Sequence, residues 1–156
     1  MTVVLDRPSP PTASRGLPRE LDLEGCRSLL QQVGWGILAT VCDGRPYAVP
    51  VGYALGDDCV FVASGSGQKL MNLEAQPAAC LTVCDVDTYD RWRSVVIQGS
   101  VTEVVGTMAR TRAIAAFATQ RSPRGAGGAD LKRLLSARIF GIALAGMSGR
   151  ERGSPR

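Results

Sequence analysis

The segment Ser64–Lys69 holds the groups best suited to bind an anion. It reads Ser-Gly-Ser-Gly-Gln-Lys, so glycines, whose backbone can turn tightly, directly precede the expected start of a short helix. Ser66 adds a hydroxyl, Lys69 adds a point charge, and the helix N-terminus supplies amide donors for a phosphate. On spacing alone, the alternative is a plain Gly/Ser loop that carries a solvated lysine.

Two other segments carry candidate binding groups. The strand expected over Tyr47–Tyr53 contains Pro50 and follows Pro46, and prolines leave strand backbone unpaired at an edge, a strand start or a bulge. Such backbone can bond a ligand, but an ordinary edge strand has the same pattern. Further on, Trp92 could stack on a ring and Arg93 could reach an anion, unless both belong to a surface ion-pair cluster.

The sequence contains no histidine. Nucleophile systems that need a histidine base cannot form within the chain, and histidine-ligated haem and zinc sites are excluded as well. We expect no metal site, and no catalytic residue stands out. Tyr53, Tyr89 and Asp90 could exchange protons, but each is more often structural. The chemistry is therefore expected to belong to a cofactor.

The cysteines, the charge and the apolar runs bear on redox chemistry, on partners and on the compartment. There are five cysteines and no CxxC motif, which favours free buried thiols over a disulfide framework or a zinc knuckle. Cys80 and Cys84 share a face of one expected strand, a weak redox hint. A net charge of +4, without a basic stripe among aromatics, predicts no nucleic-acid partner. With neither a signal peptide nor a membrane-length apolar run, a cytoplasmic protein is expected.

Hydropathy patterns predict one mainly β domain over 21–147, between a flexible arm (1–20) and a frayed basic tail (148–156). Strands are expected at 35–41, 45–55, 59–64, 78–86, 93–105 and 137–147, the fifth bending at Gly99. Helices are expected from Asp22 to Gly34, after Gly67, over 107–120 and over 129–135. Asp43-Gly44 is a strong hairpin signal. Strands this apolar on both sides suit an antiparallel barrel covered outside by helices or a second subunit.

Four segments in their chain order resemble the FMN-binding split-barrel family of the pyridoxamine-phosphate-oxidase type, and particularly its nitroimidazole-resistance branch. The resemblance covers Leu23 to Arg150. Its segments are GWGILATVCDGRPYAVPVGYAL, FVASGSGQKLMNLEAQPAACLTV, YDRWRSVVIQGSVTEV and ARIFGIALAGMSGRE.

The resemblance implies a mainly β fold, a six-stranded antiparallel split β-barrel, in a homodimer with two FMN sites at the subunit interface. It places Gln68 and Lys69 at the FMN phosphate, and Trp92 or Arg93 as residues that close the site. The cofactor-binding residues predicted in this way are Tyr47, Val49, Pro50, Val51, Val62, Ala63, Ser64, Ser66, Gln68, Lys69, Trp92, Arg93 and Ser94.

The sequence departs from the family pattern at several positions. The histidine common in the nitroimidazole-resistance branch is missing, and Gln68 replaces the usual arginine before the lysine, which removes a positive charge from the phosphate site. Tyr47 and Gly52 stand where true pyridoxamine-phosphate oxidases have an arginine and a lysine, so pyridoxamine phosphate is not the expected substrate. The last strand ends in Gly149-Arg150 rather than Gly-Lys.

These observations predict an FMN-dependent oxidoreductase that acts on a small organic molecule by hydride or electron transfer. A deazaflavin-dependent reductase of the same fold is an alternative, because QKLMNLEAQP also resembles the K-x-x-N-L-x-x-x-P segment of such proteins. Two more alternatives remain. One is a non-enzymatic flavin or haem binder, with haem held by Cys, Tyr or Met. The other is a flavin-free barrel used in biosynthetic tailoring.

Overall fold

The first helix and the first hairpin follow directly from local sequence signals. The Asp22 carboxylate caps helix α1 (Leu23–Val33) by accepting a hydrogen bond from the Gly25 amide at 2.7 Å, and Gly34 ends the helix with φ at 68°. Strands β2 (Trp35–Cys42) and β3 (Arg45–Leu55) are joined by Asp43-Gly44, both at positive φ, as a tight two-residue hairpin turn requires. Both predictions are confirmed.

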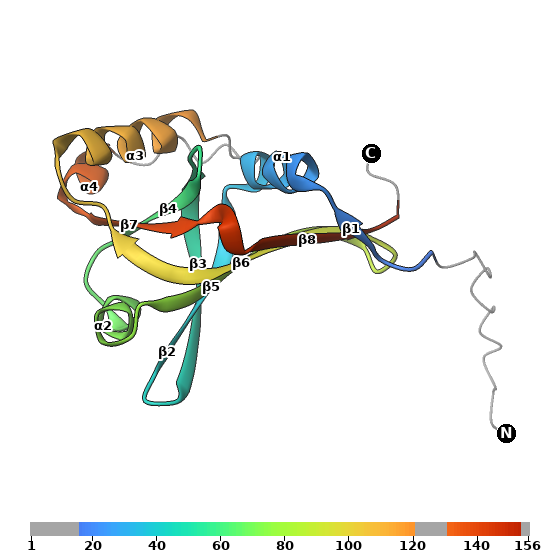
Figure 1. Cartoon of the computed structure of the whole chain (residues 1–156), viewed down its shortest axis with the longest axis horizontal. Coiled ribbons are helices and arrows are strands. Elements are labelled where there is room, and N and C mark those ends of the chain that lie inside the picture. The colour runs from blue at the N-terminus through green and yellow to red at the C-terminus, as the bar shows by residue number, and fades with distance from the viewer. Residues whose placement is uncertain (1–15, 121–130, 154–156) are drawn as a thin grey trace, which may run out of the picture.

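The computed structural model describes residues 16–120 and 131–153 (Figure 1). The remaining elements are β1 (Arg19–Leu21), β4 (Cys59–Ser64), α2 (Gln68–Ala75), β5 (Ala78–Thr88), β6 (Arg91–Glu103), α3 (Thr107–Thr119), α4 (Leu131–Ser136), β7 (Arg138–Ala143), the 3₁₀ turn η1 (Leu144–Gly146) and β8 (Met147–Arg152). No helix within the described ranges is long and apolar enough to cross a membrane.

Six of the strands close an antiparallel barrel. They follow the order β6-β5-β2-β3-β4-β7, and β7 pairs back on β6 to complete the ring. The long strand β6 has two partners on one side, because Trp92–Ile97 pair with β8 and Val101–Glu103 pair with β7. The partner changes around Gly99, where the sequence predicts a bend. The predicted six-stranded antiparallel barrel with small helices is confirmed.

The C-terminal segment corrects the prediction of a frayed tail from residue 148. Strand β7 ends at Ala143, and after η1 the chain forms β8, which pairs with both β6 and β1. Within β8, Gly149 and Glu151 are buried while Ser148 and Arg150 are exposed. Hydropathy could not reveal this strand, because its buried carboxylate is acceptable only next to Arg19, whose guanidinium lies 2.7 Å away. Most of the predicted N-terminal arm, residues 1–15, lies outside the described residues.

Two apolar clusters hold the barrel together. The larger one fills its interior and continues under α1, and the smaller one lies between α3, α4 and the outside of β3 and β7. Tyr53 ties the larger cluster to α1, since its hydroxyl donates to the Leu30 carbonyl at 2.8 Å and accepts from the Gly34 amide at 3.3 Å. Burial raises the pKa of Tyr53 well above its ordinary value, and its hydroxyl is already hydrogen-bonded within the protein.

Candidate functional site

One half of strand β3 has an unpaired backbone edge. The residues Arg45–Gly52 pair with β2, but β4 joins β3 only at Tyr53–Leu55, and no described strand covers the rest of that edge. Because Cys42 and Arg45 flank a two-residue turn, hydrogen-bonded and non-hydrogen-bonded pairs alternate from there along the hairpin. Pro46, Ala48 and Pro50 fall on the non-hydrogen-bonded pairs, so their backbone groups point to the free edge.

The two prolines determine what this edge can bond. Neither Pro46 nor Pro50 has an N–H, so neither breaks the β2 ladder and neither offers a donor to the free edge. The Ala48 amide is therefore the one N–H that the Arg45–Val51 stretch directs outward, beside the carbonyls of residues 46, 48 and 50. The predicted proline-marked edge is confirmed. Up to Val51 it carries one donor among three acceptors, and the Gly52 amide follows on the same side just before β4 joins.

The Ser64–Lys69 segment begins where β4 leaves β3. After the Tyr53–Val62 pair, Ala63 and Ser64 pair only with β7, and the chain then turns into α2. Gly67 occupies the N-cap position of α2 at φ 144°, a conformation that side chains disfavour, and no side chain in the described part of the chain caps the first-turn amides. The Lys69 side chain is half-buried and makes no ion pair or hydrogen bond with any residue that the structure describes.

The predicted residues differ in which groups they can offer a ligand. Val49, Val51 and Val62 face the barrel interior, and Ala63 packs against the smaller apolar cluster outside the barrel. Any contribution of these four residues would therefore come from the backbone. The Ser64 hydroxyl is buried and donates to the Gly65 carbonyl at 2.8 Å. Ser66 and Lys69 have available side chains, and the Tyr47 ring is 37% exposed on the side of the hairpin that faces α2.

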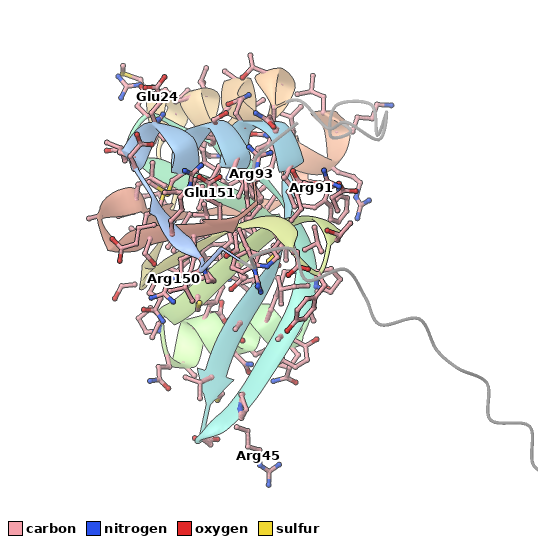
Figure 2. The ribbon with its side chains drawn as sticks, turned by 90° about the vertical axis from the view of Figure 1, so that its right-hand side faces the viewer. Glu24, Arg45, Arg91, Arg93, Arg150 and Glu151 are labelled. Atoms are coloured by element: carbon pink, nitrogen blue, oxygen red, sulfur yellow. The ribbon has the colours of Figure 1, made fainter. Side chains whose placement is uncertain are left out.

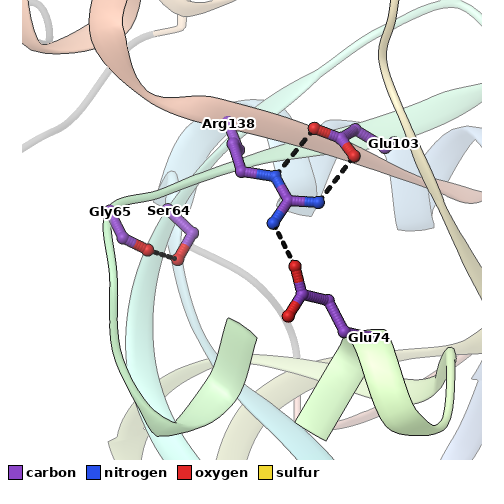
Figure 3. Close-up of polar contacts among 5 residues, drawn as sticks. All are labelled: Ser64, Gly65, Glu74, Glu103 and Arg138. Atoms are coloured by element: carbon purple, nitrogen blue, oxygen red, sulfur yellow. Dashed lines mark hydrogen bonds and ion pairs between the residues drawn. The ribbon is translucent and has the colours of Figure 1, made fainter. Parts of the chain in front are cut away.

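An arginine that the sequence analysis did not select fixes α2 to the barrel (Figure 3). Arg138 lies opposite Ser64 on β7, and its guanidinium binds the Glu103 carboxylate through two hydrogen bonds of 2.7 and 2.8 Å. A third bond from the same group reaches Glu74 of α2. The hydrogen bonds from Arg138 hold the pKa of Glu103 below its ordinary value, and the two carboxylates raise the pKa of Arg138 further above its own.

We call Arg138 with Glu103 and Glu74 the clamp, and it predicts a specific pH dependence of stability. Because the pKa of Glu103 is lowered in the folded state, its stabilising effect is complete above its ordinary value of 4.5 and is lost as the pH falls through the lowered pKa. We expect Glu103→Gln to lower the melting temperature at pH 7, and this difference from wild type to shrink as the pH falls below 4.5. Melting curves from pH 7 to pH 3 measure it; a difference that stays constant would contradict the assignment.

Gln68 is engaged in a chain of hydrogen bonds. Its side-chain amide donates to Asn72 at 2.8 Å, Asn72 donates to the Thr40 hydroxyl at 3.1 Å, and Thr40 donates to the Tyr47 carbonyl at 3.4 Å. We call Gln68, Asn72, Thr40 and the Tyr47 carbonyl the amide relay. Its two central side chains are buried. One donor of Gln68 is thus used inside the protein rather than offered to a ligand.

Trp92, Arg93 and Ser94 lie far from α2 within one chain. On β5, Ser94 pairs with Cys84, and Thr40, which contacts α2, pairs with Ala79. Cys84 and Ala79 are five residues apart, or about 17 Å along the strand. Successive strand residues also point to opposite faces, so Trp92 and Ser94 face one side and Arg93 the other. A shallow cavity of about 330 Å³ lies at this hairpin end, next to Trp92, Arg93 and Arg152.

Arg93 belongs to a row of alternating charges across four strands. Arg19, Glu151, Arg93 and Asp85 are register partners in turn from β1 to β5, and Arg93 lies 2.8 Å from Asp85. Arg93 also donates to Gln32 of α1 at 3.2 Å. Figure 2 shows Arg93 and Glu151 together near α1, while Arg45 lies at the distant tip of the β2–β3 hairpin. Within one chain Arg93 therefore makes the ion pair that the surface-cluster alternative predicts.

Trp92 and Ser94 belong to a broad outer surface that no described helix covers. Cross-strand register places the following outward-pointing residues on it, here called the open face: Trp35, Ile37, Ala39, Ala48, Pro50, Cys80, Thr82, Cys84, Trp92, Ser94 and Val96. None of these side chains is charged, but the register continues into β8, where Arg152 and Arg150 lie beside Trp92 and Ser94 at the edge of this face. Trp35 and Ile37 are 52% and 45% exposed. α3 and α4 cover the barrel elsewhere, so only part of its apolar exterior is buried within one chain (Figure 1).

All five cysteines are free, as predicted, but the expectation of buried thiols holds only for Cys26: Cys42, Cys59 and Cys80 are partly buried and Cys84 is exposed. Burial and the neighbouring Asp58 raise the pKa of Cys59 to about 11, and burial likewise raises the pKa of Cys26 and of Cys84. Thiolates are the reactive form, so these three thiols are held in their inert form at neutral pH. Among the described residues, no group of three Cys, Asp or Glu side chains could hold a metal ion.

We therefore expect slow alkylation of the native protein. A pKa near 11 rather than 9.0 lowers the thiolate fraction of Cys59 at pH 7 by about a hundredfold. Iodoacetamide should label Cys59 that much more slowly than a cysteine of the urea-unfolded chain, as peptide mass spectrometry can measure. Rapid labelling of Cys80 or Cys84 that abolished activity would instead support the redox hint.

Comparison with known proteins agrees with this architecture. The sequence pattern of the family described as pyridoxamine 5'-phosphate oxidase matches residues 22–151, which is most of the chain. The chain belongs to this family. A curated relative, an uncharacterized protein from Rhizobium meliloti, is 28% identical over 89 residues. The match spans 57% of this chain and 59% of the relative.

Solved structures of related proteins show the same fold. A FAD-binding protein from Mesorhizobium loti is 26% identical, with a TM-score of 0.70 and a match over 88% of this chain and 98% of that one. A candidate 5-nitroimidazole antibiotic resistance protein from Bacteroides thetaiotaomicron has a TM-score of 0.70 at 16% identity over 89% and 92% of the two chains. A FAD-binding protein from Mycobacterium smegmatis has a TM-score of 0.66 at 18% identity over 89% and 100%.

Within this family's barrel, sequence reasoning missed the residues that act between elements. Arg138, Asn72 and Thr40 each carry a polar group whose partner lies 32 or more residues away. Asn72 gave at most a partial signal, as a polar residue directly between the apolar Met71 and Leu73. No local pattern marks Arg138.

Proposed function

We propose that this protein is a flavin-dependent oxidoreductase that uses FMN and acts on a small organic molecule. One observation carries the proposal. The unpaired edge of β3 offers the Ala48 amide among three carbonyls, and β4 leaves this edge to enter a Gly/Ser turn. The helix N-terminus after that turn, and Lys69, which no described residue pairs with, suit a phosphate. Membership of the family and the likeness to a FAD-binding protein from Mesorhizobium loti support it.

The residues of the chain fit the two ends of such a cofactor. Ser66, Lys69 and the first-turn amides of α2 would hold the phosphate, and one charge-assisted hydrogen bond there contributes about 1.5–3 kcal/mol. The Ala48 amide and the carbonyls of Pro46 and Pro50 would bond a ring edge that carries both N–H and C=O groups. A bound flavin supplies hydride or electron transfer, while the protein orients its ring and excludes water.

A second copy of the chain would complete the site. Monomeric proteins seldom expose large, mostly apolar surfaces, and the open face is such a surface up to its edge at Arg150 and Arg152. Trp92 and Ser94 lie on it together with Ala48 and Pro50 of the ring-binding edge. We propose that two chains pack through their open faces, so that one protomer brings Trp92 and Ser94 to the β3 edge of its partner.

The compartment is part of the same proposal. Five free cysteines suit a reducing environment, and on that ground we place the protein in the cytoplasm.

The Ala48 amide offers a direct test of the ring contact. Ala48→Pro removes this N–H without breaking a ladder bond, because residue 48 occupies the same kind of pair as Pro46 and Pro50. We expect flavin affinity to fall by roughly two- to tenfold, as the loss of one hydrogen bond implies. Ala48→Gly, which keeps the amide, is the control for fluorescence titrations. Equal affinities in the two variants would exclude this contact.

The experiment that tests the function as a whole is the visible absorption spectrum of the purified protein. The small molecule that heating releases from the protein is then identified by chromatography. A two-band yellow spectrum with released FMN would establish the cofactor, and released FAD would keep the function but change the cofactor. A bound deazaflavin would favour the deazaflavin-dependent reductase. A colourless protein that ignores added FMN and FAD would refute the proposal in favour of a flavin-free barrel.

A further inference from the structure

The amide relay joins the two ends of the proposed cofactor site. It starts at Gln68, the first residue of α2, beside Lys69 and the Gly/Ser turn. It ends at the carbonyl of Tyr47, on the stretch of β3 whose other edge is free. The elements it connects lie far apart in the chain, since Asn72 and Thr40 are 32 residues apart.

The relay has little freedom to rearrange. Asn72 is 2% exposed and Thr40 is 4% exposed, so neither side chain can replace a lost partner with bulk water. A buried amide without its hydrogen bonds is costly, so Asn72 keeps α2 at a fixed position against β2. Thr40 then transmits this position to β3, because its hydroxyl accepts from Asn72 and donates across the hairpin to Tyr47.

The opposite end of α2 is held independently. Arg138 binds Glu74 near the C-terminus of the helix and anchors it to Glu103, on the side of the barrel where β7 lies. The clamp therefore fixes α2 relative to β7, while the relay fixes it relative to the β2–β3 hairpin. Of these two contacts, only the relay leads to the free edge of β3.

We propose that Asn72, acting through Thr40, is a positioning residue that sets the separation between the phosphate end and the ring end of the site. This role rests on the proposed flavin function, and it specifies how a single cofactor contacts both ends. Without the relay each end can still bind its own part of a flavin, but the two parts no longer reinforce each other. The phosphate then adds less to the affinity than it does in the intact protein.

The test compares Thr40→Val with Thr40→Ser. Valine keeps the shape and removes the hydroxyl, whereas serine keeps the hydroxyl and thus the relay. Dissociation constants for lumiflavin, riboflavin and FMN are measured by fluorescence on refolded, flavin-free protein, below the melting temperature of every variant. We expect the preference for FMN over riboflavin to fall roughly three- to tenfold in Thr40→Val and to persist in Thr40→Ser. Lumiflavin, which has no phosphate, should bind all three proteins alike.

The outcomes separate this inference from the function on which it rests. A Thr40→Val protein that loses affinity for FMN and riboflavin by the same factor, or loses none, overturns the positioning role and leaves flavin binding intact. Wild-type protein that binds none of the three flavins overturns the proposed function and this inference with it. Should Thr40→Val fail to fold, Thr40→Ala removes the same hydroxyl without a branched side chain and gives the same comparison.

Discussion

Replacing Lys69 with alanine should weaken FMN binding by roughly 10- to 150-fold and leave riboflavin binding nearly unchanged. The range follows from the loss of one charge-assisted hydrogen bond to phosphate, about 1.5–3 kcal/mol. Lys69 is half-buried in the first turn of α2, whose amides no described side chain caps. No described carboxylate pairs with Lys69, so its charge is available to a ligand. Isothermal titration of the flavin-free protein with each flavin measures both affinities.

The control must remove a positive charge without touching the site. Arg112 is exposed on α3, on the other side of the barrel from α2 (Figure 1). Arg112→Ala should leave both affinities as in wild type, apart from a small change that salt screens. A Lys69→Ala protein that lost riboflavin and FMN affinity equally would show that Lys69 supports the fold or the ring, and the phosphate assignment would be wrong.

Replacing Ile37 with aspartate should convert the proposed dimer to a monomer and abolish the proposed flavin binding. Ile37 lies on the open face, where a packed partner would bury the new carboxylate without a counter-charge, at a cost of several kcal/mol. The side chain is 45% exposed in one chain, so the change should not unfold the protomer. Sedimentation velocity gives the oligomeric state, and the flavin absorbance of the same samples gives the occupancy.

Met108→Asp is the matched control for this second prediction. Met108 is 74% exposed on α3, away from the open face, so its replacement should leave both the dimer and the bound flavin unchanged. A wild-type protein that is monomeric with flavin bound would contradict the shared site. If Ile37→Asp lost the dimer but kept the flavin, each chain would hold its cofactor alone, and Trp92 and Ser94 of the partner would have no part in it.

The sequence by itself determined the features that depend on a few neighbouring residues. Asp22 and Gly34 mark the ends of α1, Asp43-Gly44 forms the tight hairpin turn, and the prolines mark an unpaired edge, because caps and turns are satisfied within three or four residues. The order of the segments was enough to predict the barrel and the family. The same local reasoning predicted that α2 begins after a Gly/Ser turn.

Only the tertiary structure decided which polar groups meet. Arg138 and Glu74 are 64 residues apart, and Arg19 and Glu151 are 132 apart, so no periodicity connects them. Strand β8 was missed for this reason, because its buried Glu151 is stable only once Arg19 is in place. Trp92 and Arg93 are neighbours in the sequence, yet the pleat of β6 sends one to the open face and the other to an ion pair under α1. Hydropathy describes each residue alone, whereas the energy of a buried charge or amide depends on a partner that only the completed fold provides.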